Sequence, residues 1–288
     1  MKILKTSAVA QKLALKLRLE NKVIGFVPTM GYLHEGHISL IKTAHKKADV
    51  VFVSIFVNPI QFGPAEDFTR YPRDLKRDEK LCKKAGVDYI FYPDEKNMYP
   101  DNYSTYIDME NITEILEGKI RPSHFKGVTT VCLKLFNIIC PHFAVFGQKD
   151  AQQLVVIKKM VSDLNLPLKI IEGETVREPD GLAMSSRNVY LSNEQRNDAS
   201  VLYKALSYAK RKISNGYNRD IDFLTHQMYK LIKSRPAVTK IDYIAFNDNR
   251  TLKPVESLKN VKKNTELLIS LAVRFGKIRL IDNIVIKH

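Results

Sequence analysis

The sequence contains few cysteines, no long apolar run and fewer acidic than basic side chains. Its three cysteines, Cys82, Cys132 and Cys140, form no C-x-x-C pair and cannot all be paired within one chain, so we expect buried thiols rather than a redox or metal site. The longest apolar runs, such as residues 50–57, fall far short of the ~20 residues that a membrane helix needs. No signal peptide is evident after Met1, and we expect a cytoplasmic protein without a membrane partner.

Basic residues outnumber acidic ones by 46 to 31, which gives a formal net charge of +15. Lysine is spread along the whole chain rather than clustered, and this favours solvated surface lysines over a face that binds nucleic acid. We therefore expect no specific nucleic-acid partner, and phosphate-bearing substrates could use part of the excess charge. With 288 residues and 44% hydrophobic content, the chain can bury a core in one large or two moderate domains.

The first part of the chain alternates strand-like apolar runs with amphipathic stretches. This alternation predicts an α/β fold, with a Rossmann-like parallel sheet that carries helices on both faces, over residues 1–175. Ligands of such sheets gather at the carboxyl ends of the strands. The predicted strands are residues 23–29, 50–57, 89–92, 144–146 and 169–172, and the predicted helices are 38–47, 75–85, 128–139 and 151–164.

The pattern changes after a Pro/Gly turn cluster at residues 177–181. Long polar helices come first and strand-like runs follow, so residues 176–288 are predicted to form a smaller C-terminal α+β domain. The predicted helices are residues 193–214 and 221–234, and the predicted strands are 241–247, 266–273 and 278–286.

The most informative segment is P-T-M-G-Y-L-H-E-G-H at residues 28–37, between the apolar runs 23–27 and 38–41. It indicates a strand, a glycine turn and a helix, and the N–H groups and dipole at the start of that helix favour an anion. Two imidazoles, His34 and His37, can face the same phosphates. The segment lacks the Lys-Ser/Thr pair of a P-loop and the His-Glu-x-x-His spacing of a zinc protease, so a nucleotide site of another kind is predicted.

This segment resembles the H-x-G-H signature of the nucleotidylyltransferase superfamily, which includes class I aminoacyl-tRNA synthetases. The full ten-residue sequence of this segment resembles the pantothenate synthetase (pantoate–β-alanine ligase) family more specifically. Further segments resemble that family in the same order, so the resemblance runs nearly end to end. They are N-P-I-Q-F at 58–62, R-P-S-H-F at 121–125, F-G-Q-K-D-A-Q-Q at 146–153, M-S-S-R-N at 184–188 and G-K-I-R-L-I-D-N at 276–283.

The resemblance implies ATP-dependent condensation of pantoate with β-alanine through a pantoyl adenylate, which releases AMP and pyrophosphate. The attacking carboxylate is already ionised at neutral pH, so cationic donors that offset phosphate charge matter more than a base. His34, His37 and Lys149 match the family's phosphate-binding residues, and His37 matches its proton donor. The positions that match ATP-binding residues are Met30, Gly31, Tyr32, Leu33, His34, Glu35, Gly36, His37, Gly147, Gln148, Lys149, Asp150, Val176, Met184, Ser185, Ser186 and Arg187.

Gln61 and Gln153 match the family's pantoate-binding glutamines and are assigned to the pantoate/β-alanine site. Pantoate combines hydroxyls and a carboxylate with a gem-dimethyl carbon, so its pocket needs apolar walls, for which Met30, Phe56 and Phe62 are candidates. Residues 184–187 resemble the mobile loop of class I synthetases, and with Gly181 as a hinge they predict a moving lid.

The resemblance also implies Mg²⁺ on the ATP phosphates and a homodimer. The metal ligands remain unknown from the sequence, with Asp150 and the pair Asp78 and Glu79 as candidates only. Two positions depart from the usual family pattern, because Ser123 replaces a common glycine and His142 a common aspartate.

Two alternatives stay open at this point. Another H-x-G-H nucleotidylyltransferase would join a nucleotide to its acceptor and give a product that retains AMP. An RNA-binding protein built on a decayed synthetase core is suggested only by the charge of +15.

Overall fold

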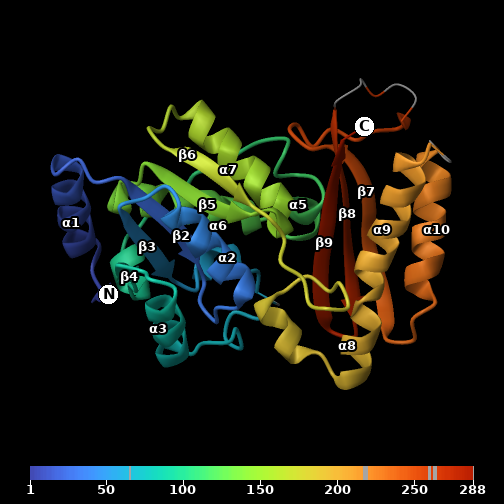
Figure 1. The fold of residues 1–288 in the computed structure, drawn as a ribbon, viewed down its shortest axis with the longest axis horizontal. Helices are drawn as coiled ribbons and strands as arrows, with labels where there is room; N and C mark the ends of the chain where they lie inside the picture. Colours follow the sequence, from blue (N-terminus) through green and yellow to red (C-terminus); the bar gives the residue numbers. More distant parts are fainter. Residues whose placement is uncertain (65, 217–219, 259–260, 262–264, 288) are drawn as a thin grey trace. The chain divides into compact units, whose positions relative to one another are not determined.

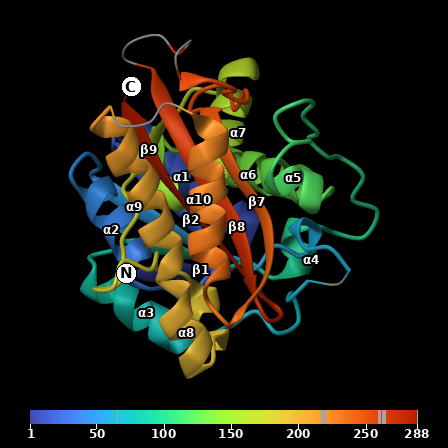
Figure 2. The ribbon, with the colours of Figure 1, turned by 90° about the vertical axis from the view of Figure 1, so that its right-hand side faces the viewer.

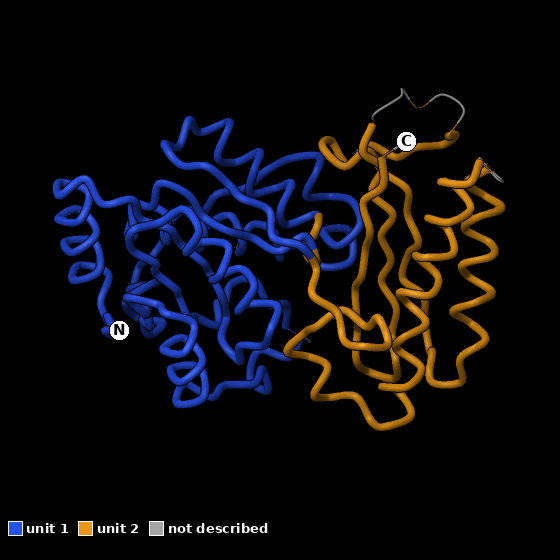
Figure 3. The backbone as a smooth tube through the Cα atoms, viewed as in Figure 1, with its two compact units in different colours: residues 1–148, 152–174 blue, residues 149–151, 175–288 orange. Residues whose placement is uncertain are grey.

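The computed structural model describes residues 1–64, 66–216, 220–258, 261 and 265–287. The chain divides into two compact units, and each is described by itself (Figure 3). Unit 1 comprises Met1–Gln148 and Gln152–Glu174, and unit 2 comprises Lys149–Ala151 and Thr175–His288. The division into functional domains at residues 1–175 and 176–288 stays a prediction.

Unit 1 is built on a six-stranded parallel sheet with the order β1-β4-β3-β2-β5-β6 (Figure 1). The predicted parallel sheet is thereby confirmed. One edge strand, β1, was not predicted, because three residues are too few to show a strand pattern. The strands are β1 (Lys2–Leu4), β2 (Ile24–Thr29), β3 (Val50–Ile55), β4 (Tyr89–Phe91), β5 (Phe143–Gly147) and β6 (Lys169–Gly173).

Side chains alternate between the two faces of this sheet, as the two-residue repeat of a strand requires. Phe26 and Phe52 pack in a cluster with α1, α6 and α7. Val27 and Val53, each one residue further along its strand, pack in a separate cluster with α2 and α3. Helices therefore cover both faces, as predicted. Their bounds are α1 (Ser7–Leu19), α2 (Glu35–His45), α3 (Leu75–Lys84), α6 (His124–Ile139) and α7 (Ala151–Asp163), and α1 was not predicted.

Three short helical turns come after strands, namely η1 after β3, α4 after β4 and η2 after β5, and a fourth, α5, precedes α6. They are η1 (Pro59–Gln61), α4 (Glu95–Met98), α5 (Glu117–Ile120) and η2 (Gln148–Asp150). Neighbours of β2 in the sheet are β3 on one side and β5 on the other, so the order of strands reverses there. Crevices at such reversal points, outside the carboxyl ends of the strands, are where open α/β sheets bind ligands.

Unit 2 contains a three-stranded antiparallel sheet whose one face is covered by α9 and α10 (Figure 2). The smaller α+β unit is thus confirmed as a fold. One predicted helix, 193–214, is divided at Ser200 into two. The elements are η3 (Ser186–Tyr190), α8 (Asn193–Ala199), α9 (Val201–Ser214), α10 (Ile221–Lys233), β7 (Val238–Asp248), β8 (Glu266–Phe275) and β9 (Ile278–Lys287). Within the described part of the chain, none of the helices combines the length and apolarity that a bilayer span demands.

Candidate active site

The turn after β2 is held by one buried carboxylate, that of Asp78 on α3. Its Oδ2 accepts a hydrogen bond from the N–H of Tyr32 at 2.8 Å, and its Oδ1 accepts one from the N–H of Leu33 at 2.8 Å. Gly31 has φ +85°, and a Cβ there would lie 2.9 Å from Cγ2 of Ile55. Only glycine combines that conformation with so close an approach, so the turn depends on this residue.

The two histidines cap the helix that they begin. His34 is the N-cap of α2, and its Nδ1 accepts from the N–H of Gly36 at 3.2 Å, while Nδ1 of His37 accepts from the N–H of His34 at 3.2 Å. Because each Nδ1 accepts, the proton of each neutral ring lies on Nε2. The ring centroids are 4.1 Å apart. Two Nε2–H donors are therefore set side by side at the positive end of the helix dipole.

The backbone N–H groups of this turn are used within the protein, which differs from the sequence-based expectation. Gly31 donates to Oγ1 of Thr29 at 3.1 Å, and Tyr32 donates to Asp78. The N–H groups of His34 and Gly36 go to the two imidazoles. A phosphate at this helix would therefore be held by the Nε2 donors and the helix dipole more than by these amides.

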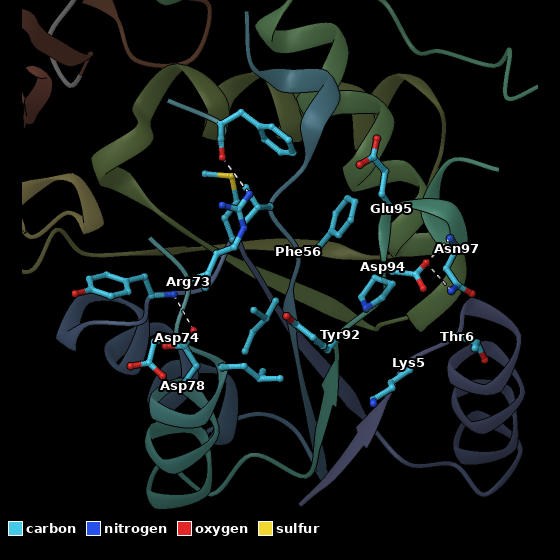
Figure 4. A pocket seen from close by; sticks show the side chains of 18 residues that line it. Lys5, Thr6, Phe56, Arg73, Asp74, Asp78, Tyr92, Asp94, Glu95 and Asn97 are labelled. Carbon is cyan, nitrogen blue, oxygen red and sulfur yellow. Dashed lines mark hydrogen bonds between the residues drawn. The ribbon is translucent and has the colours of Figure 1, made fainter. Parts of the chain in front are cut away.

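A pocket of about 500 Å³ opens at the carboxyl ends of β1 to β4 in unit 1 (Figure 4). Met30 and Phe56, two of the three predicted apolar walls, line it. The third, Phe62, packs on Phe68 and Tyr71 with ring centroids 5.4 and 5.9 Å apart. Figure 4 shows charged and polar groups on two sides of the pocket: Arg73, Asp74 and Asp78 on one, and Asp94, Glu95 and Asn97 on the other.

Gln61 lies beside this pocket, at the end of η1. Its Nε2 is 3.0 Å from Sδ of Met30, and its Oε1 accepts from Nδ2 of Asn58 at 3.0 Å. Gly127 of α6 packs directly against this turn, since a Cβ there would lie 2.5 Å from Cα of Gln61. The structure thus brings Gln61, predicted from the second motif, to Met30 of the first.

Of the two adjacent glutamines on α7, only Gln153 was predicted to face substrate. Gln152 is buried, its Nε2 donates to the carbonyls of Ile112 and Ile115 at 2.8 Å each, and its Oε1 accepts from the N–H of Glu117 at 2.9 Å. Gln152 therefore braces the segment before α5. Its neighbour Gln153 is half-buried, and its role in binding substrate stays a prediction.

The R-P-S-H-F segment ties the loop after η1 to the start of α6. Arg121 pairs with Glu66, with Nη2 2.6 Å from Oε2 and Nε 2.6 Å from Oε1. Nε2 of His124 accepts from Arg121 at 3.2 Å, so its Nδ1 carries the proton and donates to the carbonyl of Gln61 at 3.0 Å. Burial and the neighbouring Arg121 charge lower the pKa of His124 to about 4, against the opposing effect of Glu66 and Glu117.

This lowered pKa predicts a pH-dependent loss of stability. Unfolded His124 takes up a proton near pH 6.5, while the folded state resists protonation down to about 4, so its contribution is complete above 6.5 and declines as the pH falls towards 4. Denaturant unfolding of the wild type and His124→Gln should show their difference in unfolding free energy shrinking by roughly 1–2 kcal/mol between about pH 7.5 and about pH 5. An unchanged difference would contradict the lowered pKa of His124.

In unit 2, Lys149 is fixed through its main chain by the I-D-N tail of β9. Asn283 donates from Nδ2 to the carbonyl of Lys149 at 2.8 Å, and Nζ of Lys149 lies 3.5 Å from Oδ1 of Asp150. Next to Asn283, the buried Asp282 forms a bidentate pair with Arg177 at 2.7 and 2.9 Å. Burial raises the pKa of Asp282, against the opposing effect of Arg177 and Lys149. The tail motif therefore positions Lys149.

The segment that precedes the M-S-S-R motif is a tight hairpin in unit 2. Met184 donates its N–H to the carbonyl of Val176 at 3.0 Å, which brings these two predicted adenosine positions together. Gly181 has φ +94°, and a Cβ there would lie 2.3 Å from Cδ1 of Tyr203. Arg177 also donates to the carbonyl of Gly181 at 3.0 Å. Gly181 is therefore a closely packed turn that requires glycine, and its role as a hinge stays a prediction.

The predicted site residues fall into three local groups. Residues 30–37 and Gln61 form one group in unit 1, Gly147, Gln148 and Gln153 belong to the β5–α7 region of the same unit, and Lys149, Asp150, Val176 and Met184–Arg187 belong to unit 2. Ser185 caps η3, with its Oγ accepting from the N–H of Arg187 at 3.3 Å.

The metal candidates do not form a protein-built metal site. Both oxygens of Asp78 accept backbone hydrogen bonds, and Asp150 is paired with Lys149. Among the residues that the structure describes, no three His, Cys, Asp or Glu side chains are grouped to hold an ion. A dedicated Mg²⁺ cage would need more oxygen ligands than these.

Known proteins resemble this chain over its whole length. The family model for pantoate-beta-alanine ligase matches residues 2–285. A pantothenate synthetase of Caldicellulosiruptor bescii is 54% identical over 277 residues, which are 96% of each chain. One from Sulfurihydrogenibium sp. is 50% identical over 284 residues and covers 99% of each.

Solved structures agree with these matches. The crystal structure of a pantothenate synthetase from Thermus thermophilus has a TM-score of 0.90 at 41% identity and covers 99% of both chains. The structure of a pantoate-beta-alanine ligase from Francisella tularensis, described as complexed with beta-gamma ATP and beta-alanine, has a TM-score of 0.79 at 37% identity, covering 99% of this chain and 97% of that one. These matches support the ligase interpretation and neither alternative: the chain belongs to the pantoate–β-alanine ligase family.

Proposed function

We propose that this chain condenses pantoate with β-alanine to give pantothenate, at the expense of ATP, through an enzyme-bound pantoyl adenylate. The single observation that carries the proposal is the imidazole pair on α2, whose rings lie 4.1 Å apart with both Nε2–H groups as donors. Family membership supplies the substrates, ATP, pantoate and β-alanine.

In the first half-reaction, a carboxylate oxygen of pantoate attacks the α-phosphorus of ATP, and the bond to pyrophosphate breaks. The attacking group is already an anion, so charge on the phosphates is the main obstacle. His34 and His37 are proposed to donate to phosphate oxygens from Nε2, with His37 as the proton donor, and Lys149 to supply a fixed positive charge. Ser185, Ser186 and Arg187 are proposed to add further donors to the phosphates, as a lid loop.

In the second half-reaction, the amine of β-alanine attacks the acyl carbon of the adenylate. The acyl C–O bond breaks, AMP leaves with the electron pair of that bond, and the nitrogen releases a proton to solvent as the amide forms. Before this step the adenylate must be kept from water, and the buried Gln61 beside the partly buried Met30 suits that purpose. Mg²⁺ is proposed to enter with the ATP phosphates, and a homodimer located in the cytoplasm remains part of the proposal.

The two glutamines are expected to serve pantoate and not ATP. Gln61→Ala or Gln153→Ala should leave a pantoate oxygen unpaired in a partly apolar pocket, at a cost of roughly 1–3 kcal/mol, and lower kcat/KM for pantoate about 5- to 150-fold. ATP affinity, measured by calorimetry without pantoate, should change much less. Gln152→Ala is the matched control, because it should reduce stability more than pantoate use. Equal damage to ATP and pantoate use would contradict the assignment.

Product analysis tests the proposed function itself. Purified protein with ATP, pantoate and Mg²⁺ should release AMP and pyrophosphate at full rate only when β-alanine is added, and pantothenate should form in equal amount. A product that retains AMP would favour a nucleotidylyltransferase instead. Accumulation of ADP and orthophosphate would rule out adenylate chemistry.

A further inference from the structure

A series of buried and partly buried hydrogen bonds links Tyr99 to Gln61 in unit 1. Oη of Tyr99, the residue after α4, donates to Oδ1 of Asn58 at 2.7 Å. Nδ2 of Asn58 donates to Oε1 of Gln61 at 3.0 Å and to the carbonyl of Gly127 at 3.1 Å. Asn58 is 1% exposed and Gln61 is 7% exposed, so water contributes little to either amide.

The chemistry of the partners fixes the direction of every bond in this chain. The carbonyl of Gly127 can only accept, so Asn58 must turn its NH₂ towards it and its oxygen towards Tyr99. Asn58 therefore donates to Gln61 Oε1. The NH₂ of Gln61 then points to Sδ of Met30, a residue that lines the pocket. The pocket end of Gln61 is thus a donor and not an acceptor.

The surroundings of Tyr99 keep its hydroxyl in the donating form. Its ring packs against Phe56 and Tyr103, with centroid distances of 6.1 and 5.1 Å, and Nζ of Lys134 lies 5.8 Å from its ring centroid. Burial raises the pKa of the Tyr99 phenol, with a smaller effect of the neighbouring Tyr103. The phenol accordingly stays protonated throughout the range in which the enzyme would work.

We propose that Tyr99 is a positioning residue for the carboxylic acid substrate. It acts through Asn58 and orients the Gln61 amide so that an N–H meets an oxygen of pantoate. This inference rests on the proposed function. Without the Tyr99 hydroxyl, Asn58 keeps a buried, unpaired oxygen and only the carbonyl of Gly127 still orients it, so Gln61 would sample orientations that present its oxygen to the substrate oxygen more often.

A double-mutant cycle tests the relay. Tyr99→Phe should raise KM for pantoate about 3- to 10-fold, the range expected for one net hydrogen bond, with kcat and KM for ATP changed less than about 2-fold. In a Gln61→Ala background, Tyr99→Phe should raise KM for pantoate no further, because the residue through which it acts is gone. Tyr103→Phe is the matched control, since it alters the neighbouring ring without touching the hydrogen bond to Asn58.

Each result supports or overturns the relay. Additive effects of Tyr99→Phe and Gln61→Ala would overturn it and leave Tyr99 a purely structural role. A normal KM for pantoate in Gln61→Ala would overturn both the relay and the assignment of Gln61 to pantoate, even though the enzyme still formed pantothenate. Failure of the proposed function would look different, because the wild-type protein itself would not use pantoate. If Tyr99→Phe does not fold, ¹⁵N spectra of the wild type test the relay instead. Adding pantoate should shift the signal of the Gln61 side-chain amide. A signal that does not move would overturn the relay.

Discussion

His37→Ala should lower the rate of pantoate-dependent adenylation about 10²-fold or more, the scale expected when a positioned transition-state donor is lost. The reason is the loss of one of two neighbouring Nε2–H groups, which we propose donate to the developing phosphate charge. The rate is measured as pyrophosphate release in single turnovers. Lys42→Ala, an exposed position on the same helix, is the control and should retain near-normal rates.

His37→Glu separates the capping role of this residue from its chemistry. Glutamate at the third helical position can accept from the backbone N–H of His34, as the imidazole does, so thermal stability should return towards the wild-type value. The adenylation rate should stay low, because an ionised carboxylate has no N–H to donate. Recovery of the rate together with stability would show that His37 acts only as a cap.

Lys149→Ala should also lower adenylation about 10²-fold or more, because it removes the positive charge that we propose for the phosphates. The fold should survive, because Asn283 holds the main-chain carbonyl of Lys149 and the substitution leaves that atom in place. Lys158→Ala is a suitable control, since that lysine is 44% exposed in its pair with Glu172. Near-normal turnover in Lys149→Ala would mean that the phosphate site is elsewhere.

Much of the fold could be predicted from hydrophobic periodicity, because buried parallel strands are near-continuous apolar runs. The exceptions have physical reasons. β1 has only three residues, and α1 carries apolar side chains on its exposed side as well as on its buried side, which obscures the helical repeat. Helices α8 and α9 are separated at Ser200, whose φ of −59° and ψ of −17° are still helical. No glycine or proline stands there, and the break could therefore not be predicted from the sequence.

The site was predictable where one short segment carries the chemistry. His34 and His37 lie together in sequence, and their helix start follows from strand–turn–helix patterning. Asp78 and Tyr99 could not be predicted in their roles, because they act on residues 46 and 41 positions away. Nothing local in the sequence indicates that Asp78 braces the first glycine turn or that Tyr99 stands behind Gln61.

The two departures from the family pattern have simple explanations. Ser123 has φ −95°, an ordinary backbone conformation in which glycine has no advantage. His142 uses Nδ1 to accept the N–H of Ile24 at 3.0 Å, a contact that a carboxylate could also make. Burial lowers the pKa of His142, with Arg18 acting in the same direction, which keeps that nitrogen able to accept. Neither position alters the proposed chemistry.

Exchange of labelled pyrophosphate into ATP tests the central claim most directly, because it isolates the adenylation half-reaction. The purified enzyme with ATP, Mg²⁺ and labelled pyrophosphate should catalyse exchange once pantoate is added, without any β-alanine. The amine enters only after the adenylate has formed, so it should be dispensable here. Exchange that requires β-alanine, or no exchange at all with an enzyme that makes pantothenate, would contradict an enzyme-bound pantoyl adenylate that forms before β-alanine reacts.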